Sequence, residues 1–166
     1  MKIKSEEILK GLISVFKINE YRVEVYKKLM NMIHNPELQP FFKSQLDESE
    51  TIIQALNPLM DSMENAESPL HFEDAKMNQS QFYFGMARAS KNPRTVMVSC
   101  QFGDEYLVKM YKKMLEVFEI KTLPYLREIL MRHLNNLQIS FEKIENTILE
   151  NIPVLRKKQE NTQYVE

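Results

Sequence analysis

The residues of this chain that could do chemistry interrupt the apolar stripes of four predicted helices, near the middle of each helix. These candidates are Asn19, Glu20 and Tyr26 in the first helix, Gln45 and Ser49 in the second, Gly103, Asp104, Glu105 and Tyr111 in the third, and His133 in the fourth. If the four helices are aligned, the polar interruptions lie at one level of the core, and the two phenols can hydrogen-bond to them. We expect this level to form a polar core.

Carboxylates and an imidazole at one level of a helical bundle are the donors that hold two metal ions in carboxylate-bridged di-iron and di-manganese proteins. In such proteins two helices each supply a Glu, and two each supply Glu-x-x-His. In this chain, none of the histidines is preceded by glutamate three positions earlier. The alternative hypothesis of a degenerate iron or manganese site has as ligands Glu20, Glu50, Asp104, Glu105 and His133. The leading hypothesis has no metal and no cofactor, because acidic residues beside a stripe are usually solvated or paired with arginines, here Arg22, Arg127 or Arg132.

The remaining reactive side chains favour structural roles. Cys100 lies on the apolar stripe of the third helix with no histidine near it in sequence, which predicts a buried, inert thiol. His133 is the one histidine in a core stripe, and we expect a hydrogen-bonded core imidazole there rather than a ligand. The chain has no Gly-rich phosphate loop, no nucleophile elbow and no paired-cysteine zinc spacing. We therefore predict no catalytic residues.

The elements that must position these residues are four long amphipathic helices. Apolar residues recur at alternating spacings of four and three, which is typical of helices packed in a near-parallel bundle. The predicted helices span residues 5–33, 38–63, 96–119 and 124–150, and Asn151 and Pro153 are expected to end the last. Asn92 and Pro93 are a start signal for the third helix. The sequence therefore predicts an all-α fold.

The connection between the second and third helices, residues 64–91, is long enough to decide the topology. It allows a short helix with apolar positions between Phe72 and Met86. A helix of about 28 residues is about 42 Å long. A connection of this size can return along the bundle, which predicts a ferritin-like four-helix bundle with a long crossover and with the second and third helices parallel. A homodimer formed through this connection would have at its contact Phe72, Phe82, Tyr83 and Phe84.

Length, charge and cysteine content limit the class of protein. At 166 residues the chain is one domain, with the bundle expected over residues 1–152 and a solvated tail over residues 153–166. The net charge of −1 gives no attraction to nucleic acid or to an anionic membrane. No apolar run approaches the roughly 20 residues of a membrane helix. One cysteine and no secretory signal favour the cytoplasm.

Three segments, GLISVFKINEYRVEVYKKL, NPELQPFFKSQLDESETIIQAL and CQFGDEYLVKMYKKML, resemble a bacterial ferritin-like family of conserved proteins of unknown function. The resemblance covers residues 8–150. The positions that match its motifs are Glu20 in place of an aspartate, Tyr26, Gly103, Asp104 and Glu105 in reversed order, and Tyr111. Gln101 replaces an acid of the motif, which weakens the metal hypothesis. The resemblance implies a ferritin-like bundle with a crossover and supplies no activity.

These patterns together predict a non-catalytic bundle protein that acts by self-association or by binding a protein partner. The metal-binding protein with a degenerate ligand set is the alternative. The sequence identifies neither a partner nor a ligand.

Overall fold

The computed structural model describes residues 6–64 and 79–163, with side chains described for residues 6–61, 79–117 and 120–146. These residues form the helical elements α1 (Glu6–Met32), α2 (Gln39–Glu64), α3 (Gln79–Ala89), α4 (Pro93–Glu116), α5 (Phe118–Lys121) and α6 (Pro124–Gln163). The shortest, α5, is a single turn of 4 residues. The described part of the chain holds no β-strand, so the predicted all-α class is confirmed.

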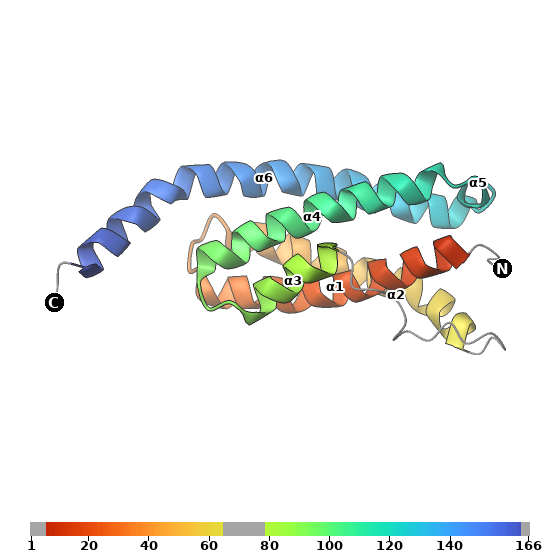
Figure 1. The fold of residues 1–166 in the computed structure, drawn as a ribbon, viewed down its shortest axis with the longest axis horizontal. Helices are drawn as coiled ribbons and strands as arrows, with labels where there is room; N and C mark the ends of the chain where they lie inside the picture. The colour runs from red at the N-terminus through yellow and green to blue at the C-terminus, as the bar shows by residue number, and fades with distance from the viewer. Residues whose placement is uncertain (1–5, 65–78, 164–166) are drawn as a thin grey trace.

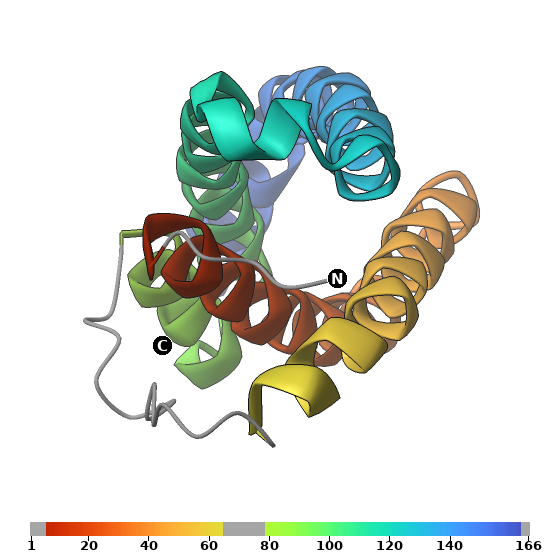
Figure 2. The same ribbon diagram turned by 90° about the vertical axis from the view of Figure 1, so that its right-hand side faces the viewer.

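The long helices α1, α2, α4 and α6 lie alongside one another (Figure 1). α1 and α6 run in one direction, and α2 and α4 run in the other. The second and third of the long helices are thus parallel, as the long connection indicates. Viewed along the bundle, the order around the core is α1, α2, α6, α4 and α3 (Figure 2). α2 packs closely on α1 but contacts α6 only sparsely, so the bundle is loosest between α2 and α6.

α4 begins at the signal that the sequence provides. The Thr95 N–H donates to Oδ1 of Asn92 at 3.1 Å, and Pro93 occupies the first helical turn, where its missing N–H costs nothing. The predicted end of this helix at residue 119 is wrong. Val117 is extended, with φ −67° and ψ 129°, so α4 ends at Glu116 and the turn α5 follows.

The end of the last long helix also differs from the prediction. α6 continues through Asn151 and Pro153 to Gln163, so the helix end expected there is wrong and residues 153–163 are helical. The run of leucine, arginine, lysine, glutamine and glutamate after Pro153 favours helix, which explains the extension. This end of α6 projects past the other helices (Figure 1). The expected short helix is α3, and the part of that prediction over residues 72–78 lies outside the described residues.

Each long helix contributes fully buried leucines to a common core. Examples are Leu12 of α1, Leu56 of α2, Leu107 of α4 and Leu130 of α6. Burying one such side chain stabilises the fold by about 1.5–3 kcal/mol. None of the helices in the described part of the chain is apolar over a length that could cross a membrane.

Candidate functional site

A fully buried arginine, Arg22 of α1, lies at the centre of the bundle. Its Nη1 forms an ion pair with the carboxylate of Asp104 on α4, which is also fully buried. Its Nε donates to Oγ of Ser49 at 3.0 Å, and its Nη2 donates to Oε1 of Gln45 at 2.8 Å, both on α2. One guanidinium therefore joins three helices. A buried charge is tolerated only when it is paired and hydrogen-bonded in this way.

Aromatic rings enclose the same guanidinium. The Arg22 Cζ lies 5.1 Å from the ring centroid of Tyr26 and 5.6 Å from that of Phe84. These distances permit cation–π attraction. Phe84 of α3 reaches this position because Gly103 of α4 has no side chain, and a Cβ there would lie 2.6 Å from the ring. The glycine in the stripe thus allows a close approach by a ring of the neighbouring helix.

A second set of polar residues continues from this network toward α6. The Tyr111 hydroxyl lies 2.6 Å from Nδ1 of His133, and both side chains are buried. The amide of Asn19 lies beside the Tyr111 phenol. Its Nδ2 donates to the carbonyl oxygen of Val15 at 2.8 Å, and Oδ1 of Asn19 has no partner among the described residues. In the tautomer of the neutral imidazole that accepts at Nδ1 from the Tyr111 hydroxyl, the proton lies on Nε2.

The structure brings together most, but not all, of the residues expected in the polar core. Those that are buried are Asn19, Tyr26, Gln45, Ser49, Gly103, Asp104, Tyr111 and His133. The expectation for the other two acids is wrong. Glu20 is exposed, and Glu105 is half-buried and pairs with Lys109 at 3.3 Å. Each follows a buried residue directly, and the next residue on a helix is turned by about 100°, away from the core.

Arg22 is the central residue that the sequence does not single out, since it appears there only as one of three arginines that could pair with acids beside a stripe. Its spacing from two buried neighbours in the sequence nevertheless indicates a core position. It lies three positions after Asn19 and four before Tyr26, which is the spacing of the buried stripe itself. Val23, the apolar residue next to it, is only half-buried.

The alternative iron or manganese ligands do not fit a metal site in this arrangement. Glu20 and Glu105 point away from the core, and the Asp104 carboxylate is paired with a guanidinium. Within residues whose side chains the structure describes, no cluster of three or more His, Cys, Asp or Glu side chains could hold a metal ion. Glu50 is half-buried, and neither it nor His133 belongs to such a cluster.

The single cysteine is equally unsuited to chemistry at neutral pH. Cys100 is free and fully buried on α4. Burial raises its pKa to about 12, against the smaller influence of the Arg22 charge. The thiol therefore keeps its proton, and only the thiolate is a nucleophile.

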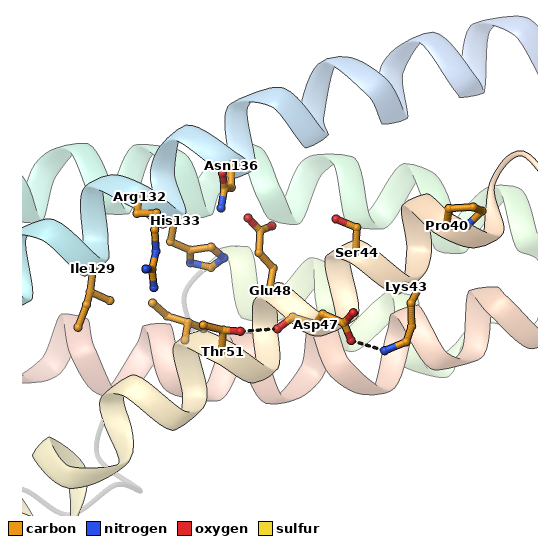
Figure 3. Close-up of a pocket in the computed structure, with 11 residues that line it drawn as sticks. Pro40, Lys43, Ser44, Asp47, Glu48, Thr51, Ile129, Arg132, His133 and Asn136 are labelled. Carbon is orange, nitrogen blue, oxygen red and sulfur yellow. Dashed lines mark hydrogen bonds and ion pairs between the residues drawn. The ribbon is translucent and has the colours of Figure 1, made fainter.

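Next to this core, a polar groove lies between α2 and α6, along the loosest side of the bundle. It has a volume of about 670 Å³ and is open to solvent. Its lining includes Glu48 and Thr51 from α2, and Arg132, His133 and Asn136 from α6 (Figure 3). Two buried atoms in this lining, Oε2 of Glu48 and Nε2 of His133, have no hydrogen-bond partner among the described residues. This size is within the range of small-molecule sites.

The buried imidazole is expected to make the protein less stable in acid. Burial, with help from the charges of Arg22 and Arg132, lowers the pKa of His133 to about 3. An unfolded histidine has a pKa of about 6.5, so between these values the unfolded chain binds more protons and stability falls as the pH falls. From pH 7 to pH 5 the resulting loss should be about 1–2 kcal/mol. Urea titrations of the wild type and of His133→Gln at both pH values measure it.

His133→Gln should show a smaller loss between the two pH values than the wild type. His34→Gln, at the turn between α1 and α2, controls for the removal of a histidine as such. An equal pH dependence in the wild type and in His133→Gln would show that this imidazole is not held neutral.

No model of a protein family matches this chain. Likewise, no curated protein and no solved structure matches it. The resemblance to a ferritin-like family therefore stays an expectation that depends on short motifs in α1, α2 and α4.

Proposed function

We propose that this protein is a non-catalytic bundle of ferritin-like topology that acts by associating with a second copy of itself. The direction of the helices supports the topology. Because α2 and α4 are parallel, the chain between them, which includes α3, must return along the bundle. That return is what distinguishes a crossover bundle from an up-down-up-down bundle.

The chemistry of the core supports a non-catalytic role. The buried charges of Arg22 and Asp104 neutralise each other, and Ser49 and Gln45 use their oxygens on the same guanidinium. A catalytic centre needs groups whose protons or lone pairs are available to a substrate. Here the Arg22 guanidinium and the oxygens bonded to it are used to hold three helices together.

The observation that carries the proposal is an exposed aromatic cluster on α3 and α4, formed by Phe82, Tyr83, Phe102 and Tyr106. Tyr83 stacks on Phe102 with centroids 5.2 Å apart and on Tyr106 with centroids 5.7 Å apart. Phe82 meets Tyr83 edge to face and is 52% exposed, and Phe102 is 42% exposed. Rigid aromatic side chains grouped on a surface are typical of the centres of protein interfaces.

The cluster includes two members of the contact that the sequence suggests. Phe82 and Tyr83 belong to it, whereas Phe84 is buried in the core beside Arg22 and is not available for contact. Phe72 lies outside the described residues. The aromatic cluster therefore differs from the predicted dimer contact. Its other members, Phe102 and Tyr106, come from α4 and not from the connection between the second and third long helices.

Charges beside the cluster fit a second copy of the same chain. Glu105 and Lys109 lie one turn apart on α4, next to Tyr106. A twofold axis near Tyr106 would place two α4 helices antiparallel, so that Glu105 of each copy faces Lys109 of the other. Such a self-complementary patch is what a twofold dimer requires.

Sedimentation equilibrium of the full chain tests this proposal. We expect a reversible dimer in the wild type, and at least a tenfold weaker association in Phe82→Ser/Phe102→Ser, because each truncated anchor costs more than about 1 kcal/mol. Tyr125→Ser on α6, which removes an aromatic side chain that is 63% exposed outside the cluster, is the matched control and should dimerise normally. A wild-type chain that stays monomeric at the highest soluble concentration would refute the proposal.

A further inference from the structure

We propose that the groove between α2 and α6 binds a free amino acid with an apolar side chain. Its ammonium group would bind Glu48, and its carboxylate would bind His133 and Arg132. This site is separate from the aromatic cluster, and the inference does not depend on self-association.

The groove is longer than its polar part. A second hollow of about 300 Å³ shares Pro40, Ser44, Glu48 and Asn136 with the first, so the two are continuous along α2 and α6. Figure 3 shows the side chains of the two helices facing each other across the polar part. A ligand can therefore lie with one end at His133 and the other end farther along α6.

The floor of the polar end offers a hydrogen-bond donor. His133 is only 3% exposed, yet it belongs to the lining of the groove. In the tautomer whose Nδ1 accepts from Tyr111, the proton lies on Nε2, which has no partner among the described residues, and a carboxylate at this place would select that tautomer. A buried N–H without a partner costs about 1–3 kcal/mol, and an acceptor placed there would recover this loss. A carboxylate oxygen is such an acceptor.

The same end also offers an acceptor that carries negative charge. Asn136 and Glu48 face each other across the groove (Figure 3), and Glu48 Oε2 is buried without a partner among the described residues. Burial is the largest influence on this group and raises its pKa, against the charges of Arg22 and Arg132. A bound cation beside Oε2 would stabilise the charged form. An ammonium group supplies both the cation and the donors that Oε2 lacks.

A cationic side chain completes the polar end. Arg132 is exposed and belongs to the lining, and no ion pair is formed by it among the described side chains. Its guanidinium can hold a carboxylate in two parallel hydrogen bonds. The site thus has a negative group and a positive group a short way apart, which fits a zwitterion better than an anion or a cation alone.

The far end of the groove has apolar surface, which accounts for the side chain of the ligand, among polar side chains that include Lys143, whose Nζ lies 5.2 Å from the centroid of the Phe41 ring. Phe41, Pro40 and Ile139 belong to its lining, and Ile139 is 69% exposed. Covering these surfaces with a branched or aromatic side chain would remove apolar area from water. Glycine could not do so, and we therefore expect leucine and phenylalanine to bind more tightly than glycine.

Isothermal titration calorimetry of the full chain with L-leucine tests the inference. We expect saturable binding, weakened at least tenfold in both Glu48→Gln and Arg132→Gln and unchanged in Glu128→Gln, an exposed acid of α6 outside the groove lining. N-acetyl-L-leucine, which lacks the ammonium, and L-leucinamide, which lacks the carboxylate, should each bind at least tenfold more weakly. Circular dichroism spectra establish that each variant is folded. Because Arg132 is exposed, Arg132→Gln should fold normally and tests the site even if Glu48→Gln does not fold.

The inference is overturned if neither L-leucine nor L-phenylalanine binds. It is also overturned if both analogues bind as tightly as L-leucine, or if the two groove variants bind as the wild type does. Sedimentation equilibrium with and without L-leucine distinguishes this inference from the proposed self-association. A protein that dimerises but binds no amino acid would overturn only the inference about the groove.

Discussion

Replacing Arg22 with methionine is expected to lower the free energy of unfolding by about 3–5 kcal/mol, the usual cost of breaking a buried ion pair by removing one partner. The substitution leaves the Asp104 carboxylate buried with no opposing charge, and it removes the donors to Ser49 and Gln45. Methionine fills much of the volume of the arginine stem, so the loss reports the charge network more than a cavity. Urea denaturation followed by circular dichroism measures the change.

The double variant Arg22→Met/Asp104→Leu separates the ion pair from packing. Replacing both charges with apolar groups is often neutral or stabilising, so this variant should recover most of the lost stability. Lys10→Met, which breaks an exposed pair with Glu6 on the same helix, is the matched control and should cost no more than about 1 kcal/mol. A loss below about 1 kcal/mol in Arg22→Met would contradict the role given to this residue.

Replacing Gly103 with alanine is the second large effect, and we expect it to lower the free energy of unfolding by about 1–2 kcal/mol. The new Cβ would lie 2.6 Å from Cε2 and 2.8 Å from Cδ2 of Phe84, a fully buried ring that packs over Arg22. Overpacking a core in this way costs about 1–3 kcal/mol. The better helix propensity of alanine returns at most about 1 kcal/mol. Thermal and urea unfolding measure the balance.

Gly85→Ala is the matched control for this prediction, because a Cβ on that helical glycine would meet nothing within 4 Å. It should raise the free energy of unfolding by about 0.5–1 kcal/mol, the ordinary gain for alanine over glycine in a helix. Combining Gly103→Ala with Phe84→Leu should reduce the specific penalty of the alanine, since leucine can vacate the space that the ring fills. If Gly103→Ala stabilises the protein as much as Gly85→Ala does, the Phe84 ring does not lie close enough to residue 103 to exclude a Cβ.

Local and periodic features of the chain could be predicted from the sequence. The apolar stripes indicate the long helices, Asn92 and Pro93 mark the start of α4, and the long connection indicates that α2 and α4 are parallel. These signals are within one helix or depend only on chain length. The end of α6 could not be predicted in the same way, because Pro153 is a helix breaker on average and the helix continues through it.

The central contact of the core depends on residues that are far apart in sequence. Arg22 is stabilised by Gln45, Ser49 and Asp104, which the fold alone brings to its side. A charged residue in a helix is usually solvent-exposed, so its position on the buried stripe was not by itself decisive. The groove could not be predicted from the sequence either, because it depends on how far α2 lies from α6 and not on any motif.

In the polar core the Arg22 guanidinium already pairs with the Asp104 carboxylate, so we expect no iron or manganese ion to bind there. Iron and manganese bound per chain, measured by mass spectrometry after loading the purified protein with each metal and then removing the excess, tests this claim directly. We predict far less than one ion per chain, with no difference between the wild type and Glu105→Ala. A near-stoichiometric metal content that is lost in Glu105→Ala would contradict the account.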